Sequence, residues 1–356
     1  MPKALHIIDS ATDRGSLYQL DRLLSPGEGV VCLGLAPSAA AGMRNKAAIQ
    51  PRRYPLGLAW LAGWLPARDD AAAEVYHAWS LGAARVAAKL AKKHCRPLVV
   101  SLRAAQPAGR LSELIRLAST LRLQVTVPVQ TFASDLIAAG LSPASVHMLP
   151  PAACPEILEA SPQQWQARRR HAREELGMAD EPLLTAPAYM LASQRHDYAT
   201  WVHAVLKQLM PRVKLLMGGD GPHEKAVRRF ARKAGYREDI LLPGNRLPQA
   251  DYLAAADAAL FPCDAMEDFS ALADALASGT PIIASDLPAL TDCIPGPCAL
   301  LAPPRNPRAF SAAALRVLED ADLARQLSQS AQAFARSRFD PAACRQRLTE
   351  LYDAIA

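Results

Sequence analysis

The sequence predicts an α/β protein made of two doubly wound halves, each a parallel sheet covered by helices on both faces. Its 356 residues are enough for two domains, and a hydrophobic content of 51% supplies a core for each. Short Val, Ile and Leu runs alternate with helical stretches, as in buried parallel strands. Pro150 and Pro155 interrupt this alternation. We therefore expect one domain over 1–155, a second over 156–340, and a helix over 341–356 that packs back on the first domain.

The first domain opens with a strand, a turn and a helix. The apolar run 4–8 is short enough for a buried strand, Gly15 and Ser16 lie in the turn after it, and Leu17 and Leu20 have helical spacing. Similar runs continue to the boundary. We expect strands over 30–35, 75–79, 97–102, 123–129 and 146–149, and helices over 83–93, 111–122 and 134–139.

The second domain repeats the same alternation. A helix over 163–175, which carries an arginine run at 168–170, leads into it. Apolar runs again mark the buried strands, and amphipathic stretches mark the helices. We expect strands over 183–186, 214–217, 240–242, 258–261, 281–284 and 299–301, and helices over 198–209, 223–234, 248–255, 271–278, 309–318 and 321–336.

The charge is unevenly divided between the halves. The formal net charge is +6, and residues 1–155 hold 17 Lys and Arg against 9 Asp and Glu, while the remainder holds 23 against 25. A basic first half suits an anionic partner such as a phosphorylated acceptor or a phospholipid surface, although solvated arginine-rich faces would give the same balance. No motif of interleaved aromatic and basic residues supports nucleic-acid binding.

Cysteine usage and hydropathy indicate a cytoplasmic protein. The seven cysteines are scattered, with no C-x-x-C pair and no zinc-ligand spacing, and we interpret them as buried thiols in a reducing compartment. No apolar run reaches the roughly 18 residues of a membrane span, and the N-terminal apolar stretch is too short for a secretory signal. The segment 52–66, with Trp60 and Trp64 on one helical face, is compatible with a peripheral contact at the inner membrane face or with a helix packed on the sheet.

The first motif with chemical content is a glycine turn between a strand and a helix. Gly219, Asp220 and Gly221 follow the strand that ends near Met217. Glycines let the backbone approach a ligand closely, and a helix N-terminus favours an anion. The same turn is also a common tight connection with no ligand.

The second motif is acidic and lies at the start of a helix. Glu267 and Asp274 flank a turn of small residues whose N–H groups, near Ser270, could hold a phosphate while the carboxylates accept ribose or sugar hydroxyls. The alternative is that Asp268 or Ser270 caps this helix.

Together and in order, these motifs resemble the retaining GT-B glycosyltransferases of the family 4 type, the glycosyl transferases group 1. The likeness extends over nearly the whole chain. The segments that carry it are 75–80, 97–103, 131–150, 215–222, 242–244, 260–262 and 275–286. It implies two Rossmann-like domains facing across a cleft, an acceptor-side domain followed by a domain that binds a nucleotide sugar.

The resemblance also implies roles for individual residues. Arg195 stands where the family has a phosphate-binding Lys, Asp274 where a Glu binds ribose hydroxyls, and Glu267 nearest to the Glu that touches the donor sugar. The first loop, the glycine turn, the start of the acidic-motif helix and the strand end beside the nucleobase complete the implied donor site. Their residues are Gly15, Ser16, Gly219, Asp220, Gly221, Asn245, Arg246, Ser270, Ala271 and Leu272.

Three positions depart from the family pattern. Arg103 stands where the family has a His close to the donor sugar, and Met190 replaces an Arg that binds phosphate. The acidic pair is seven residues apart instead of eight, with Met266 at the strict position. We keep Arg103 and Glu267 as the candidate catalytic residues, because an Arg can still stabilise charge although it cannot act as a neutral imidazole.

The implied activity is transfer of a sugar, with retention, from a nucleoside-diphosphate sugar to a glycan or a lipid-linked acceptor. No cofactor and no metal are expected, because basic side chains and helix N-termini would neutralise the leaving diphosphate. The departures support an alternative, a GT-B protein that has lost catalysis and acts as a binding or partner subunit. His77 and His196 are each compatible with a site role or with packing.

Overall fold

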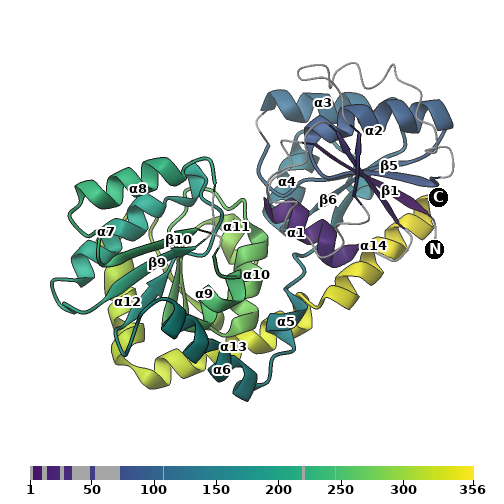
Figure 1. The fold of residues 1–356 in the computed structure, drawn as a ribbon. Helices are drawn as coiled ribbons and strands as arrows, with labels where there is room; N and C mark the ends of the chain where they lie inside the picture. Colours follow the sequence, from purple (N-terminus) through teal and green to yellow (C-terminus); the bar gives the residue numbers. More distant parts are fainter. Residues whose placement is uncertain are drawn as a thin grey trace. The chain divides into compact units, whose positions relative to one another are not determined.

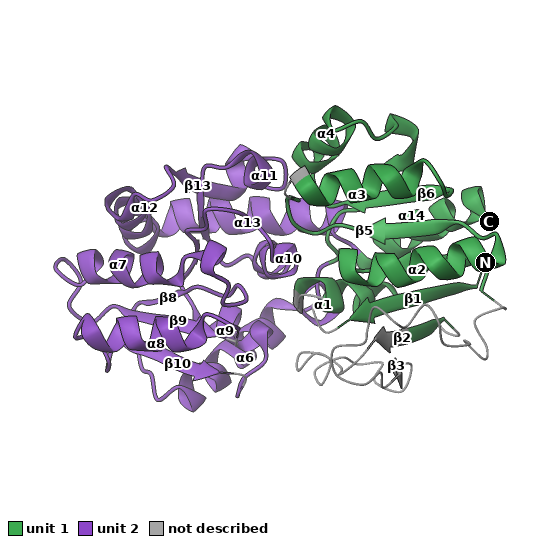
Figure 2. Cartoon of the chain, turned by 90° about the horizontal axis from the view of Figure 1, so that it is seen from above, with its two compact units in different colours: residues 1–152, 341–356 green, residues 153–340 purple. Residues whose placement is uncertain are grey.

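The structure is a computed structural model that describes residues 3–9, 14–24, 28–33, 49–52, 73–106, 108–218, 221–244 and 246–356. The chain divides into two compact units, shown in different colours in Figure 2. Unit 1 combines residues 1–152 with 341–356, and unit 2 comprises residues 153–340.

Unit 1 is built on a parallel sheet of seven strands in the order β3-β2-β1-β4-β5-β6-β7. The strands β1, β4 and β5 at its centre are almost entirely buried, as expected where helices cover both faces. The bounds are β1 Ala4–Asp9, β2 Gly29–Leu33, β3 Ile49–Arg52, β4 Val75–Ala78, β5 Leu98–Ser101, β6 Leu123–Val127 and β7 Val146–Met148.

Helices lie on both faces of this sheet, with α2 and α3 on one face and α1 and α14 on the other (Figure 1). Their amphipathic patterns explain the packing, since Leu17 and Leu20 of α1 meet Leu348 and Tyr352 of α14 in one buried cluster. The bounds are α1 Arg14–Leu23, α2 Leu81–His94, α3 Ala108–Ala118, α4 Gln130–Ala138 and α14 Pro341–Ile355.

A buried polar chain fixes α14 to the sheet. The Nδ1 atom of His77 lies 2.5 Å from the Tyr352 hydroxyl, and its Nε2 atom lies 2.8 Å from Oγ of Ser101. Ser101 in turn contacts the Thr126 hydroxyl at 2.6 Å, so one chain of hydrogen bonds crosses β4, β5 and β6. His77 therefore has a packing role, and burial holds its pKa well below the usual value.

Unit 2 is built on a second parallel sheet, in the order β10-β9-β8-β11-β12-β13. As in unit 1, the first strand of the series lies inside the sheet, and the chain extends first to one side of it and then to the other. The bounds are β8 Leu183–Thr185, β9 Lys214–Gly218, β10 Ile240–Gly244, β11 Ala258–Phe261, β12 Ile282–Ser285 and β13 Ala299–Ala302.

Two hydrophobic clusters cover the faces of this sheet. The larger contains Val202 of α7, Val227 of α8 and Phe310 of α12, and the smaller contains Ala172 of α6 and Tyr252 of α9. The bounds are α5 Pro155–Leu158, α6 Pro162–Glu175, α7 His196–Leu206, α8 Glu224–Lys233, α9 Gln249–Ala255, α10 Phe269–Ser278, α11 Pro288–Thr291, α12 Pro307–Glu319 and α13 Ala321–Arg338.

The arginine run of α6 stabilises the end of α9. Arg169 donates from Nη1 to the carbonyls of Ala254, Ala255 and Ala256 at 2.9–3.2 Å, and Arg168 pairs with Asp251 at 3.0 Å. A guanidinium at a helix C-terminus satisfies carbonyls that have no helical partner. The run is thus part of the fold of unit 2.

The structure corrects several sequence expectations. Gly15 and Ser16 lie in the first turn of α1 and not in a loop, because the helix begins at Arg14. Cys95 is exposed and Cys154 is partly exposed, so the expectation of buried thiols was wrong for both; Cys263, Cys293, Cys298 and Cys344 are buried. Trp60 and Trp64 lie outside the described residues. Among the described helices, none has the length and apolarity that crossing a bilayer requires.

We predict that the buried histidines make the protein less stable in mild acid. Burial lowers the pKa of His196 to about 4, and it also lowers the pKa of His77 and of His203. Between pH 6.5 and pH 4 the unfolded chain therefore binds more protons than the folded one. The free energy of unfolding decreases as the pH decreases, by up to about 3 kcal/mol for His196 alone. We expect the melting temperature to fall from pH 7 to pH 5, and His196→Gln to flatten that slope. An unchanged slope in the variant would contradict this account.

Candidate functional site

The carboxyl ends of β8 and β11 form the topological switch point of unit 2. The two strands are paired in parallel, with Leu184 opposite Ala258 and Thr185 opposite Ala259. From β8 the chain continues to β9 on one side, and from β11 it continues to β12 on the other. Ligands of open α/β sheets bind outside the carboxyl ends of strands at such a point. The loops that follow β8 and β11 therefore form the candidate site.

Besides the bond between Arg195 and Asp264 described below, three hydrogen bonds join these two loops directly. The Asp264 amide donates to the Ser193 carbonyl at 2.8 Å, and the Gln194 side chain donates to the Ala265 carbonyl at 3.2 Å. The Tyr189 amide donates to the Asp268 carboxylate at 2.9 Å. The positions of the side chains that the loops carry are therefore coupled.

Arg195 is held firmly at the start of α7. Its guanidinium makes two bonds to Asp197, at 3.0 and 2.8 Å, and one to Asp264 at 2.8 Å. It also stacks on the Tyr198 ring, 3.9 Å from the ring centroid. The bonds to Asp197, and then the bond to Asp264, raise the pKa of the Arg195 guanidinium. The cation predicted from the sequence is thus preorganised, but its charge is already compensated by two carboxylates.

Arg305 is a second cation at the same place, and no sequence motif indicated it. It lies between β13 and α12, and its Nε and Nη2 atoms each donate to Asp264 at 3.0 Å. This fork lowers the pKa of the Asp264 carboxyl. The Arg that the family pattern places at Met190 is absent, yet the described part of unit 2 still brings two guanidinium groups to the switch point.

The first turn of α10 is capped from within the chain. The Asp268 carboxylate accepts from the Ala271 amide at 3.2 Å as well as from Tyr189, and Asp268 is only 5% exposed. Ser270, Ala271 and Leu272 are all buried. The helix N-terminus therefore holds a carboxylate of its own, as the capping alternative predicted, and the Ala271 amide is not exposed as the phosphate-binding hypothesis expected.

Asp274 is oriented towards the start of unit 2. It is 1% exposed, and its Oδ1 atom accepts from the Cys154 amide at 2.7 Å. This bond ties the beginning of α5 to the middle of α10. The carboxylate that the resemblance assigns to ribose hydroxyls thus holds the backbone in this structure.

Glu267 is half-buried in the loop before α10, and Met266 beside it is buried. Met190 also belongs to the hydrophobic core, where burial of an Arg charge would be costly. The Met190 carbonyl accepts a hydrogen bond from the His223 amide at 3.0 Å. A Cβ atom on Gly221 would come within 2.6 Å of the same carbonyl oxygen. Gly221 is therefore needed for packing against the loop after β8.

Arg246 is the remaining predicted donor-site residue of unit 2 that the structure describes. Arg246 is exposed, and among the described residues it donates to the Pro243 carbonyl alone, at 3.3 Å. Gly219, Asp220 and Asn245 lie outside the described residues. His196 is fully buried, with Nε2 3.0 Å from the Ala188 carbonyl, so it packs inside the unit. Within the described residues, no cluster of three or more His, Cys, Asp or Glu side chains could hold a metal ion.

In unit 1 the predicted residues follow the central strands. Gly15 and Ser16 lie in the turn of α1 that comes after β1, and Arg103 follows β5. Arg103 is 4% exposed and donates from Nη1 to the Leu149 carbonyl at 3.4 Å. These three residues share the carboxyl edge of the unit 1 sheet.

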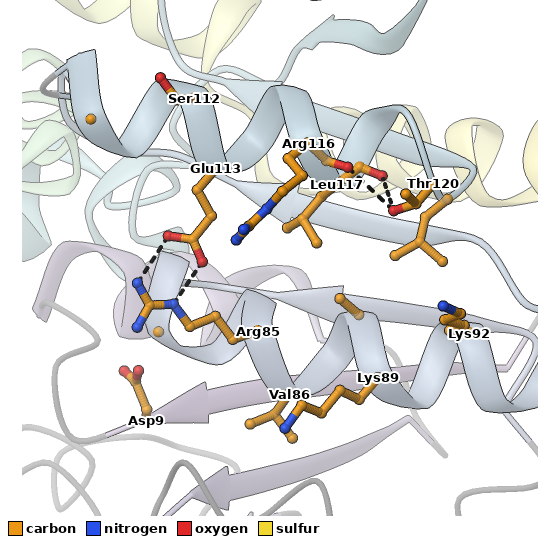
Figure 3. Close-up of a pocket in the computed structure, with 14 residues that line it drawn as sticks. Asp9, Arg85, Val86, Lys89, Lys92, Ser112, Glu113, Arg116, Leu117 and Thr120 are labelled. Atoms are coloured by element: carbon orange, nitrogen blue, oxygen red, sulfur yellow. Dashed lines mark hydrogen bonds and ion pairs between the residues drawn. The ribbon is translucent and has the colours of Figure 1, made fainter.

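Unit 1 also contains a groove of about 890 Å³ between α2 and α3, shown in Figure 3. It begins beside Asp9, at the carboxyl end of β1, and runs between the facing sides of α2 and α3. Arg85 and Glu113 bridge the helices through a bidentate ion pair at 2.6 and 2.9 Å. The other lining residues are small or apolar, or are cations: Gly82, Val86, Ala88, Lys89, Lys92, Gly109, Ser112, Arg116, Leu117, Thr120 and Leu121. Lys89 and Lys92 form no ion pair with a described residue, and the charge of Arg116 adds to that of Arg85 in lowering the pKa of the Glu113 carboxyl.

Comparisons with known proteins agree with this architecture. Residues 187–320 match the family described as glycosyl transferases group 1. No curated protein matches the chain. Among solved structures, Anabaena Alr3699/HepE in complex with UDP and glucose is 18% identical with a TM-score of 0.86, over 99% of this chain and 100% of that chain. The chain has the GT-B fold.

Two other solved structures are similar with lower TM-scores. Sucrose-phosphate synthase from Thermosynechococcus elongatus is 17% identical with a TM-score of 0.73, over 99% of this chain and 98% of that chain. WaaG, described as a glycosyltransferase involved in lipopolysaccharide biosynthesis, is 15% identical with a TM-score of 0.69, over 99% of each chain.

The capping role of Asp268 in this GT-B chain can be tested by measuring what its side chain contributes to the free energy of unfolding. Asp268→Ala leaves the amides of Ala271 and Tyr189 without their acceptor in a buried place, and we expect a loss of about 3 kcal/mol in the free energy of unfolding. Asp320→Ala, which removes the exposed cap of α13, is the matched control and should cost about 1 kcal/mol. Urea denaturation measures both values. Equal losses would show that Asp268 is an ordinary helix cap.

Proposed function

We propose that the protein is a glycosyltransferase that moves a sugar, with retention, from a nucleoside-diphosphate sugar to a hydroxyl group of its acceptor. The observation that carries the proposal is the pair of guanidinium groups, Arg195 and Arg305, at the switch point of unit 2, inside the stretch that matches glycosyl transferases group 1. A diphosphate leaving group needs positive charge at this place. The complex of Alr3699/HepE with UDP and glucose supports a nucleotide sugar as the donor.

The proposed chemistry assigns one role to each group. The bond between the anomeric carbon and the donor phosphate oxygen breaks, the acceptor oxygen bonds to the same face of that carbon, and its proton passes to the phosphate oxygen. Guanidinium groups stabilise the charge that develops on the diphosphate. Glu267 orients the donor sugar, and Arg103 stabilises charge from unit 1. The proposal includes no metal and no cofactor.

The groove of unit 1 supports a lipid-linked acceptor. Val86 and Leu117 line it and suit an apolar chain, and the cations Lys89, Lys92 and Arg116 suit a phosphate. The groove begins at the carboxyl edge of the sheet, where Gly15, Ser16 and Arg103 lie. The likeness to WaaG, described as involved in lipopolysaccharide biosynthesis, points to the same acceptor class.

Nucleotide binding is the first test of the donor. The protein should melt at a higher temperature with one of UDP, GDP or ADP, and the matching nucleotide sugar should release its nucleotide slowly when acceptor is absent. Arg195→Ala should weaken binding about 10- to 100-fold, because it removes a charge-assisted bond to phosphate. Arg325→Ala, on the exposed face of α13, is the control and should bind normally. A folded protein that neither binds nor cleaves any donor would refute the proposal.

The groove is tested with farnesyl diphosphate, which joins an apolar chain to a phosphate group. Isothermal titration should show binding that falls at least about 10-fold in Lys89→Glu/Lys92→Glu, since two attractions become repulsions. Farnesol should bind more weakly than farnesyl diphosphate. Lys233→Glu, in α8 of unit 2, serves as the charge-matched control. Equal affinities in the wild type and the double variant would exclude the groove as the acceptor site.

One observation favours a second candidate function, a GT-B protein that binds partners without catalysis. Asp268 occupies the N-terminus of α10, and Asp274 is engaged with the Cys154 amide, so two features assigned to the donor are used within unit 2. This candidate predicts no rise in melting temperature with any nucleotide. A clear rise with one nucleotide would exclude it.

A further inference from the structure

The Asp264 carboxylate lies between two guanidinium groups. Arg305 holds it through a fork, from Nε to Oδ1 and from Nη2 to Oδ2, and Arg195 also donates to Oδ2, from its Nη1 atom. Two phosphate oxygens are bound by guanidinium groups in the same planar, bidentate way. The carboxylate thus occupies a pocket of donors that matches a more highly charged anion.

Both arginines have an unusual backbone conformation. Arg195 has a φ of 53° and Arg305 a φ of 57°, in the left-handed region that residues with a Cβ rarely adopt. Among the described residues other than glycine, only Cys95 shares this property. Strained conformations of this kind persist where the surroundings fix them, and they cluster at ligand clamps. Here the strain occurs at the two residues that meet at one carboxylate.

The two arginines differ in their freedom to move. The side chain of Arg195 is 21% exposed and is bonded to Asp197 and stacked on Tyr198, whereas that of Arg305 is 67% exposed and bonds to Asp264 alone among the described side chains. An exposed ion pair is weak, because water and salt screen it. Arg305 can therefore exchange one anion for another at little cost, while Arg195 stays in place.

We propose that Arg305 is the second diphosphate-binding cation of this chain and that Asp264 is a resident stand-in for the diphosphate. The proposal rests on the proposed function and names residues of its donor site. On binding, Arg305 leaves Asp264 and forks onto the phosphate oxygens, while Arg195 keeps its bond to Asp264 and adds one to the diphosphate. Arg305 thus supplies the positive charge that the chain lacks at Met190.

The test compares variants by isothermal titration with UDP, uridine and inorganic pyrophosphate. Arg305→Ala should weaken UDP and pyrophosphate about 10- to 100-fold and leave uridine unchanged. Asp264→Asn removes the competing charge and should strengthen UDP binding by up to about 5-fold, while it lowers the melting temperature of the free protein because both arginines lose a partner. Arg325→Ala, also an exposed arginine in an ion pair, should behave like the wild type in every titration.

The outcomes separate this inference from the proposed function. If UDP binds equally well to the wild type and to Arg305→Ala, the role of Arg305 in diphosphate binding is refuted and the proposed function stands. If pyrophosphate binds through Arg305 but no nucleotide binds, the role of Arg305 stands and the proposed function fails. If neither ligand binds to a folded wild type, both fail. Weaker UDP binding by Asp264→Asn would show that Asp264 positions the arginines and does not stand in for the ligand.

Discussion

The candidate donor site of unit 2 depends on the parallel pairing of β8 with β11. The chain leaves these strands towards opposite sides of the sheet, so the loops after them meet in a place that no crossover helix fills. Asp264 and Asp268, both from the loop after β11, bind the loop after β8. Asp268 compensates the N-terminal dipole of α10, and Asp264 compensates two arginines. The site is thus built from charges that are balanced before any ligand arrives.

The fold could be predicted from the sequence because its strands are continuous apolar runs of ordinary length. β11 and β12 differ from the expected ranges by at most one residue, since each lies between a helix and a turn with clear signals. β3 was not predicted, because Ile49–Arg52 contains a proline and two polar residues and has no apolar run. The start of α1 was placed too late because Gly15 in a first turn resembles a loop residue. Side-chain chemistry alone does not mark such boundaries.

The candidate site was only partly predictable, because motifs give positions and not orientations. The acidic motif located α10, but the sequence does not reveal that Asp274 accepts from Cys154, 120 residues away. Arg305 carried no signal either, since it follows two prolines in a connection and meets Arg195 only through the order of strands in the sheet. The capping residue was recognisable, because Asp268 immediately precedes the helix, although a phosphate at the same helix end explained the pattern equally well. The structure distinguishes helix capping from phosphate binding, because the Ala271 amide already donates a hydrogen bond to the Asp268 carboxylate.

The central claim is that unit 2 binds a nucleoside diphosphate at the β8–β11 switch point through two arginines. A crystal structure with the nucleotide that raises the melting temperature most tests it directly. We predict the diphosphate within hydrogen-bond distance of Arg195 and Arg305, with the fork between Arg305 and Asp264 opened. A nucleotide bound elsewhere, or bound while that fork remains intact, would contradict the claim.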